Sequence, residues 1–140
     1  IVSSSNNTQL CGNARRFGVY EKFEAVLGAA DFNADSKIER ARKYLAESGA
    51  EKGRILVVGD LEHDAEMAAE IGAECVLLTS GHEHPDRLAR SGAVVFDKIE
   101  ELISFVQSWQ CKKILFVKYK QKTDLLTICS QNIYKILKIL

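Results

Sequence analysis

Short apolar runs alternate with helical patterns along residues 1–106, and this alternation restricts the fold more than any other feature of the sequence. The clearest run covers residues 55–58, where four consecutive apolar residues precede Gly59. A continuous apolar run predicts a strand that helices cover on both faces. Alternating strands and helices predict βαβ units, which right-handed crossovers join into a Rossmann-like three-layer α/β sandwich with a mostly parallel sheet.

Capping residues and apolar spacing predict where the helices and strands lie. Ser36 and Glu39 have the S-x-x-E spacing of a capping box, and Gly49 stops the helix that follows. The sequence predicts strands at 1–2, 25–30, 54–59, 75–79 and 93–96. It predicts helices at 8–17, 36–48, 64–71, 87–90 and 98–106.

The distribution of charge divides the chain into two parts. Residues 1–109 carry 12 Lys/Arg and 18 Asp/Glu, whereas residues 110–140 carry seven Lys and one Asp. We therefore expect one domain over 1–106 and a basic apolar tail over 107–140 that is non-native or poorly ordered. Residues 114–119 of this tail are also compatible with a strand. The functional alternative is a helix that binds a partner or a membrane surface through Ile133, Ile136, Leu137 and Leu140.

Length and composition exclude several classes of protein. A chain of 140 residues can form one domain with a hydrophobic core but not two ordinary ones. It has no apolar stretch long enough for a membrane span and no signal-peptide pattern. Its four cysteines lack zinc-like spacing, and Cys75 is interpreted as a buried free thiol, which fits a cytoplasmic location. Because Ile1 opens the chain within a strand already under way, we expect a fragment.

Two carboxylates stand at the end of the strand at 54–59. Gly59 allows a sharp turn, Asp60 follows it, and Asp64 falls one helical turn further on. Both side chains would converge beyond the carboxyl end of the strand, where open α/β sheets bind ligands. Two hard oxygen ligands at such a point favour Mg²⁺. The structural alternative is that Asp64 is a helix N-cap and Asp60 a turn residue.

Two further groups could serve the same site. Ser3, Ser4 and Ser5 follow a strand, and Asn6 leads into a helix, so hydroxyls, amides and free N–H groups would form an anion cradle. Lys37 opens a helix, where a cation meets the unfavourable end of the helix dipole, which suggests a negative partner nearby. The structural alternatives are an N-cap cluster for the first group and a solvated surface lysine for the second.

These segments together resemble the haloacid dehalogenase-like (HAD) hydrolase superfamily, especially its phosphoglycolate phosphatase and β-phosphoglucomutase-like members. IVSSSNN resembles the second motif of the family, where Ser3 stands for the strand-ending Ser or Thr. DFNADSKIERARKYL resembles the third motif through Lys37, and ILVVGDLEHDAEMAAEIGAECVLLTSGH resembles the fourth through Asp60 and Asp64. The resemblance covers roughly residues 1–106, with the three motifs in the family's order.

The resemblance implies a phosphatase mechanism in which an aspartate nucleophile attacks phosphorus, and Mg²⁺ offsets the charge of that carboxylate and the phosphate. It implies that Ser3 bonds a phosphate oxygen with help from Ser4 or Asn6. It implies that Lys37 neutralises the phosphate, and that Asp60 ligates Mg²⁺ with Asp64 acting directly or through water. The substrate would be a small phosphorylated metabolite.

The chain departs from the family pattern in two respects. The first motif of the family, DxDx[TV], carries the nucleophile, and no such sequence exists in these 140 residues. The cap that usually selects the substrate is absent as well. We therefore expect the chain to be the C-terminal part of a HAD core, catalytically inert alone, in a parent protein that is a phosphatase.

Other readings of the sequence remain open or are disfavoured. A non-catalytic HAD-derived remnant would associate through the central sheet edge that its missing first strands expose. Neither GxxxxGK[ST] nor GxGxxG is present, and a phospho-receiver domain would place its acidic pair before its lysine. Nucleic-acid binding would depend only on the basic tail. His82 and His84 lie on the expected rim of the site, as substrate contacts or as ordinary exposed loop residues.

Overall fold

The computed structural model describes residues 1–30, 36–50, 55–81, 83–108 and 113–116. Strands and helices alternate through these residues, which confirms the expected α/β class. The strands are β1 (Val2–Asn6), β2 (Leu27–Ala29), β3 (Ile55–Gly59), β4 (Glu74–Leu78), β5 (Val94–Phe96) and β6 (Lys113–Phe116). The helices are α1 (Asn7–Arg16), the short 3-10 helix η1 (Tyr20–Lys22), α2 (Lys37–Glu47), α3 (Glu62–Ile71), α4 (Pro85–Arg90) and α5 (Ile99–Ser108).

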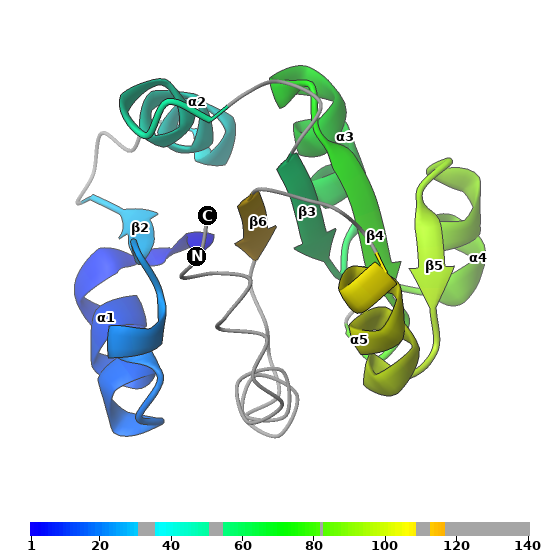
Figure 1. Cartoon of the computed structure of the whole chain (residues 1–140), viewed down its shortest axis with the longest axis horizontal. Coiled ribbons are helices and arrows are strands. Elements are labelled where there is room, and N and C mark those ends of the chain that lie inside the picture. Colours follow the sequence, from blue (N-terminus) through cyan, green and yellow to red (C-terminus); the bar gives the residue numbers. More distant parts are fainter. Residues whose placement is uncertain (31–35, 51–54, 82, 109–112, 117–140) are drawn as a thin grey trace.

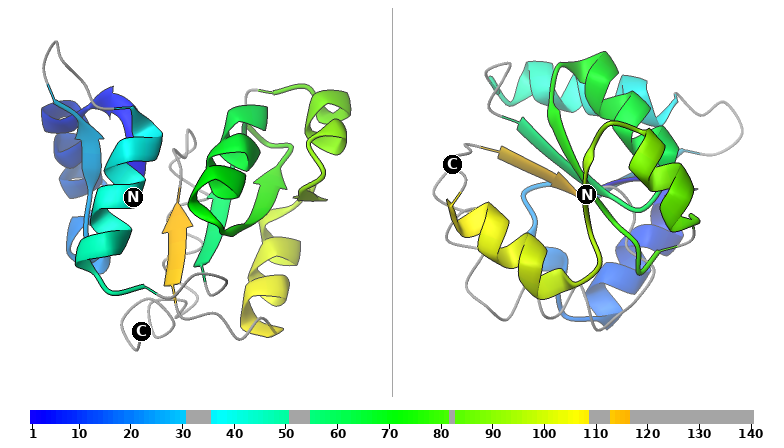
Figure 2. Two further views of the ribbon diagram at one scale, coloured as in Figure 1. Left: turned by 90° about the horizontal axis from the view of Figure 1, so that it is seen from above. Right: turned by 90° about the vertical axis from the view of Figure 1, so that its right-hand side faces the viewer.

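The strands form two parallel groups. Four of them pair in the order β5-β4-β3-β6, and β1 pairs with β2. Figures 1 and 2 show β6 between β3 and the β1–β2 pair. All pairs whose register is described are parallel, as the crossover connections of βαβ units require.

Strand β3 is buried on both faces, as its unbroken apolar sequence predicts. Ile55 and Val57 pack in one apolar cluster with residues of α2 and α3, whereas Leu56 and Val58 pack in another with residues of α5. Both clusters also contain residues from the first part of the chain, Val2 in one and Ile1 in the other. The two cores therefore hold β1 against the four-stranded sheet from both sides.

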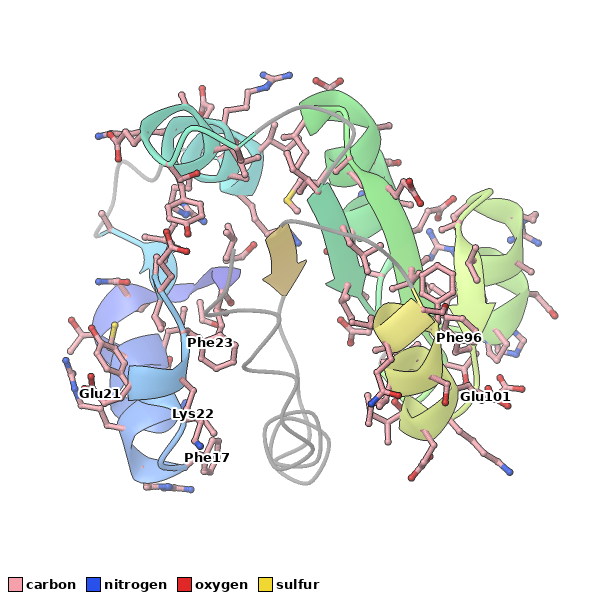
Figure 3. All side chains as sticks on the ribbon, in the orientation of Figure 1. Phe17, Glu21, Lys22, Phe23, Phe96 and Glu101 are labelled. Atoms are coloured by element: carbon pink, nitrogen blue, oxygen red, sulfur yellow. The ribbon has the colours of Figure 1, made fainter. Side chains whose placement is uncertain are left out.

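Aromatic side chains complete the cluster on the α5 side. Phe96 and Phe105 lie with ring centroids 5.5 Å apart, and Phe23 packs against the same cluster. Figure 3 shows Phe23 beside η1 and Phe96 beside α5. Phe23 also contacts the small core under α1, in which Ala14 and Val19 are buried. Tyr20 packs against the same small core.

Strand β6 bears on two expectations from the sequence. Its residues 114–116 belong to the segment 114–119 that was compatible with a strand, and residues 113–116 pair with β3. The sequence analysis expected an exposed central sheet edge, and the structure shows that β6 covers one edge of β3 by using its N–H and C=O groups. The apolar stripe at 133–140 lies outside the described residues.

Helix boundaries differ from expectation by a few residues. The capping box at the start of α2 is present, with Ser36 N–H donating to Glu39 Oε2 over 2.7 Å and Glu39 N–H to Ser36 Oγ over 3.1 Å. Helix α3 begins at Glu62, not at Asp64, and ends at Gly72, whose φ of 70° is left-handed. Helix α4 begins at Pro85, not at Arg87. No helix of the described residues is long and apolar enough to cross a membrane.

Candidate functional site

Asp60 and Asp64 are brought together by the turn between β3 and α3. Asp64 Oδ2 accepts the backbone N–H of Asp60 over 3.0 Å and that of Leu61 over 3.1 Å. Asp64 is therefore the third residue of α3, which folds its carboxylate back over the turn, and not the N-cap considered from the sequence. Both acids are buried, with residue exposures of 4 % for Asp60 and 0 % for Asp64.

Gly59 is required by space and not by its backbone conformation. A Cβ atom on Gly59 would lie 2.3 Å from Asp64 Oδ2 and 2.6 Å from Asp64 Cγ, which is far inside van der Waals contact. Its φ is not among the positive values of the described glycines. The sequence analysis linked Gly59 to a sharp turn, whereas the structure shows that it makes room for the second carboxylate.

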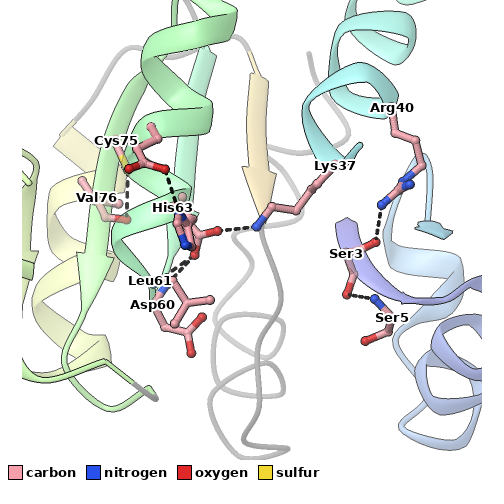
Figure 4. A network of polar contacts seen from close by, with 11 residues as sticks. Ser3, Ser5, Lys37, Arg40, Asp60, Leu61, His63, Cys75 and Val76 are labelled. Atoms are coloured by element: carbon pink, nitrogen blue, oxygen red, sulfur yellow. Dashed lines mark hydrogen bonds and ion pairs between the residues drawn. The ribbon is translucent and has the colours of Figure 1, made fainter. Parts of the chain in front are cut away.

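Lys37 supplies the positive charge beside this pair. Its Nζ lies 2.5 Å from Asp64 Oδ1, and the two side chains are 14 % and 1 % exposed (Figure 4). Lys37 is the first residue of α2, and the capping box at Ser36 fixes where that helix begins. The negative partner expected for this lysine is therefore Asp64, a residue 27 positions further along the chain.

Arg40 joins the same helix to β1, a contact for which the sequence analysis had no expectation. Its Nη2 donates to the backbone oxygen of Ser3 over 2.9 Å. Arg40 lies three residues after Lys37 and therefore on the same face of α2, which is the one signal that could have indicated it. In Figure 4, Lys37 extends toward the carboxylates and Arg40 toward Ser3, so that α2 links both parts of the proposed site.

The polar residues after β1 are engaged locally. Ser3 is buried, and its Oγ accepts the N–H of Ser5 over 3.1 Å. Asn6 is the N-cap of α1, where its Oδ1 accepts the N–H groups of Thr8 and Gln9. Ser4 and Asn6 are exposed. The N-cap interpretation is thus confirmed for Asn6, and a phosphate-binding role for Ser3, Ser4 and Asn6 stays a prediction.

The donor set at the end of β3 suits a magnesium ion. Mg²⁺ prefers oxygen ligands and is commonly held by one or two carboxylates together with water and substrate phosphate. Asp64 already accepts three N–H donors, so a direct bond to a metal would compete with Lys37, and contact through water fits better. Within the described residues no group of three or more His, Cys, Asp or Glu side chains forms a metal site by itself.

The described histidines interact with acids beside them. His84 is exposed, caps α4 by accepting the Asp86 N–H over 3.3 Å, and lies 3.4 Å from the Asp86 carboxylate. The His63 side chain is exposed on α3, where a hydrogen bond with Glu66 raises the pKa of its imidazole. His82 lies outside the described residues. These contacts favour the ordinary loop interpretation for His84.

Cys75 is half-buried rather than fully buried. Its position in β4 raises the pKa of the thiol to about 12, first through burial and then through the charge of Asp64. A thiol with so high a pKa is largely protonated near neutral pH and reacts slowly. Cys75 is thus a free thiol, as expected, although it is only partly buried.

Comparison with known proteins shows what this chain is similar to. A family model described as HAD-hydrolase-like matches residues 36–102, a range that contains Lys37, Asp60 and Asp64. A crystal structure of a predicted phosphatase from Clostridium acetobutylicum superposes with a TM-score of 0.70 at 18 % identity, over 76 % of this chain and 50 % of that one. Over residues 36–102 the chain is therefore similar to HAD-like hydrolases, and it shares the fold of this solved structure.

Curated relatives of this chain include proteins named tyrosine-protein kinase PtkA from Mycobacterium tuberculosis and Mycobacterium bovis. Each is 30 % identical over 82 residues, which is 58 % of this chain. The chain spans only 28 % of the length of these relatives and half that of the solved structure. The structural likeness therefore supports the fold, and the activity of a whole protein is a matter for proposal.

Proposed function

We propose that residues 1–106 are the C-terminal part of the core of a Mg²⁺-dependent phosphomonoester hydrolase. The observation that carries this proposal is the Lys37–Asp64 ion pair beside Asp60, at the carboxyl end of β3. Two buried carboxylates at one turn would repel each other if nothing positive stood between or beside them. One lysine compensates one charge, which leaves a negative site suited to a divalent cation.

Some residues of this chain would bind the metal and others would bind the phosphate. Asp60 would hold Mg²⁺, with Asp64 in contact directly or through water. When bound, the ion would supply positive charge opposite the phosphate oxygens. The Lys37 ammonium, held in place by Asp64, would face the same phosphate. The Ser3 hydroxyl would bond a phosphate oxygen, aided by the Ser4 amide or by Asn6, after giving up its present contact with Ser5.

The attacking group would come from outside these residues. No DxDx[TV] sequence is present in the 140 residues, so the proposal assigns the nucleophilic aspartate and the substrate-selecting cap to a segment not included here. The substrate class would be a small phosphorylated metabolite. We expect this chain alone to release no phosphate from an aryl phosphate. Turnover that depended on Asp60 would contradict the assignment of the nucleophile.

Mg²⁺ binding to the chain tests the proposal directly. Calorimetric titration should show one binding event in the wild type, weakened roughly 10- to 100-fold by Asp60→Asn, because the ion would lose a charged ligand. Asp97→Asn is the matched control, since Asp97 also follows a strand but is exposed and accepts a bond from the Thr79 hydroxyl over 2.9 Å. Equal binding by the two variants, or none by the wild type, would contradict the proposal.

Phosphoryl transfer to a protein tyrosine is a second candidate, favoured by the name of the PtkA relatives. A lysine and a divalent metal would serve that reaction as well, because in both reactions positive charge must offset the negative charge of the transferred phosphoryl group. In a protein that contains this chain together with its missing segment, incubation with labelled ATP separates the two. Label on tyrosine side chains indicates a kinase, and phosphate released from a small phosphomonoester indicates a phosphatase.

A non-catalytic interaction module is the remaining alternative. Its basis was an exposed central sheet edge, and in the structure β6 pairs with one edge of β3. Association would then use the edge of β5, at the end of the four-stranded sheet. Size-exclusion chromatography across a concentration series tests this alternative, because a strand-edge dimer dissociates on dilution whereas a monomer elutes unchanged.

A further inference from the structure

Gly81, in the connection between β4 and α4, lies directly against the Asp60 side chain. A Cβ atom on Gly81 would be 2.2 Å from Asp60 Cβ, 2.4 Å from Asp60 Oδ2 and 2.7 Å from Asp60 Cγ. All three of the nearest atoms belong to Asp60. The φ of Gly81 is not among the positive values, so this glycine is needed for space rather than for its backbone freedom.

The two acids of the site are thus each packed against a glycine from a different strand end. Gly59 makes room for Asp64, and Gly81 makes room for Asp60. The sequence offers one signal for this arrangement, because Gly81 follows β4, which pairs directly with β3 in parallel. The carboxyl ends of neighbouring parallel strands meet at one edge of the sheet, where ligands bind.

Two ion pairs of Arg87 lie near Gly81. Arg87 on α4 donates from Nη2 to Glu62 over 2.9 Å, and its Nη1 lies 3.1 Å from Glu83. Glu83 is two residues after Gly81, and Glu62 is the first residue of α3, two before Asp64. On the other side, the Thr79 N–H donates to the oxygen of Phe96 over 3.1 Å. The residues that flank Gly81 thus contact α3 on one side and β5 on the other.

We propose that Gly81 is a positioning residue that fixes the direction of the Asp60 carboxylate toward a bound divalent cation. This inference rests on the proposed function, which makes Asp60 the metal ligand. With 4 % exposure and a glycine backbone against its Cβ and Oδ2, Asp60 has little room for another side-chain conformation. A methyl group at residue 81 would push the carboxylate away from its present direction.

The test compares Gly81→Ala with Gly12→Ala. Gly12 is a matched control because it lies in α1, lacks a positive φ, and a Cβ there would meet nothing within 4 Å. Gly81→Ala should weaken Mg²⁺ binding roughly 10- to 100-fold, as loss of a supporting contact at metal sites does, and Gly12→Ala should leave it unchanged. Calorimetry gives the affinity, and circular dichroism with thermal unfolding shows whether the fold is kept.

A purely structural role for Gly81 predicts a different result. It would lower the unfolding temperature of Gly81→Ala while Mg²⁺ affinity stayed at the wild-type value, and that outcome would overturn the inference. The signal of bound Mn²⁺ in electron paramagnetic resonance gives a second readout, which should broaden or weaken in Gly81→Ala alone. A wild-type chain that binds neither ion would contradict the proposed function, whereas equal binding by wild type and Gly81→Ala contradicts only the positioning role.

A double variant keeps the test decisive if Gly81→Ala fails to fold. Asp60→Gly removes all three atoms that the new methyl group would meet. Gly81→Ala should therefore fold and melt normally in the Asp60→Gly background, so that the two substitutions are strongly non-additive. Additive losses of stability would show that the methyl group disturbs something other than Asp60 and would overturn the inference.

Discussion

The turn after β1 and the turn after β3 carry similar polar signals and satisfy them in different ways. After β1, the neutral Asn6 caps the exposed start of α1 with bonds to residues two and three positions away. After β3, the charged Asp64 is buried and bonds Lys37, 27 positions away, as well as the turn itself. Water can replace a partner at an exposed cap, whereas a buried carboxylate depends on the partner that the fold supplies.

This difference indicates that the turn after β3, and not the turn after β1, is the part that binds a ligand. A buried charge pair contributes little net stability, because desolvation offsets much of the attraction between the charges. The cost of burying Asp60 and Asp64 is therefore understandable if the site binds something, whereas the cap at Asn6 is accounted for by α1 alone.

The largest effect should come from Lys37→Met. The substitution keeps most of the side-chain volume but leaves Asp64 buried without its cation, and removing one partner of such a pair costs about 3–5 kcal/mol. Urea denaturation measures the loss. Lys43→Met, an exposed lysine on the same helix, is the matched control and should change stability little. A cost below about 1 kcal/mol for Lys37→Met would remove the contrast between the two turns, because a broken buried pair costs more than that.

A smaller effect should follow from Arg40→Gln, which removes the guanidinium bond to the Ser3 oxygen. Leaving a buried acceptor without its charged donor costs roughly 2 kcal/mol. Faster hydrogen exchange of the β1 amides should accompany the loss, because β1 would lose its tie to α2. Arg42→Gln is the control, since its bond to Glu70 is an exposed ion pair that contributes little. Equal results for the two arginines would show that α2 does not hold β1.

The smallest effect should come from Asn6→Ala, which removes the cap of α1 at a cost of about 1 kcal/mol. Asn13→Ala within the same helix should be neutral or slightly stabilising, because alanine favours a helix interior. Thermal unfolding of both variants gives the comparison. If Asn6→Ala also weakened Mg²⁺ or phosphate binding, the turn after β1 would belong to the site, and the two turns would differ less in function.

The local parts of the fold were predictable because their causes are local. The apolar run before Gly59 indicated a strand covered on both faces, and Ser36 with Glu39 indicated the start of α2. The start of α3 was misplaced by two residues for a physical reason. Asp64 resembles an N-cap in sequence, but its carboxylate accepts N–H groups from the turn before the helix, which requires it to lie inside α3.

The candidate site was predictable in its members more than in its contacts. Spacing and family resemblance selected Lys37, Asp60 and Asp64, and the structure places these three together. Arg40 and Gly81 were missed, because the first contacts a residue 37 positions away and the second acts only through the space it leaves empty. The wider site, in which Ser3, Ser4 and Asn6 join these three residues around one phosphate, stays a prediction.

The sequence by itself determined the alternation of strands and helices, the capped start of α2 and the acidic pair at the end of β3, because periodicity, capping and turn chemistry act over a few residues. Only the tertiary structure decided that Lys37 faces Asp64, that Arg40 holds β1, that β6 pairs with β3, and that Gly81 touches Asp60. Those contacts join residues far apart in the chain, and their geometry is set by how the helices and strands pack together.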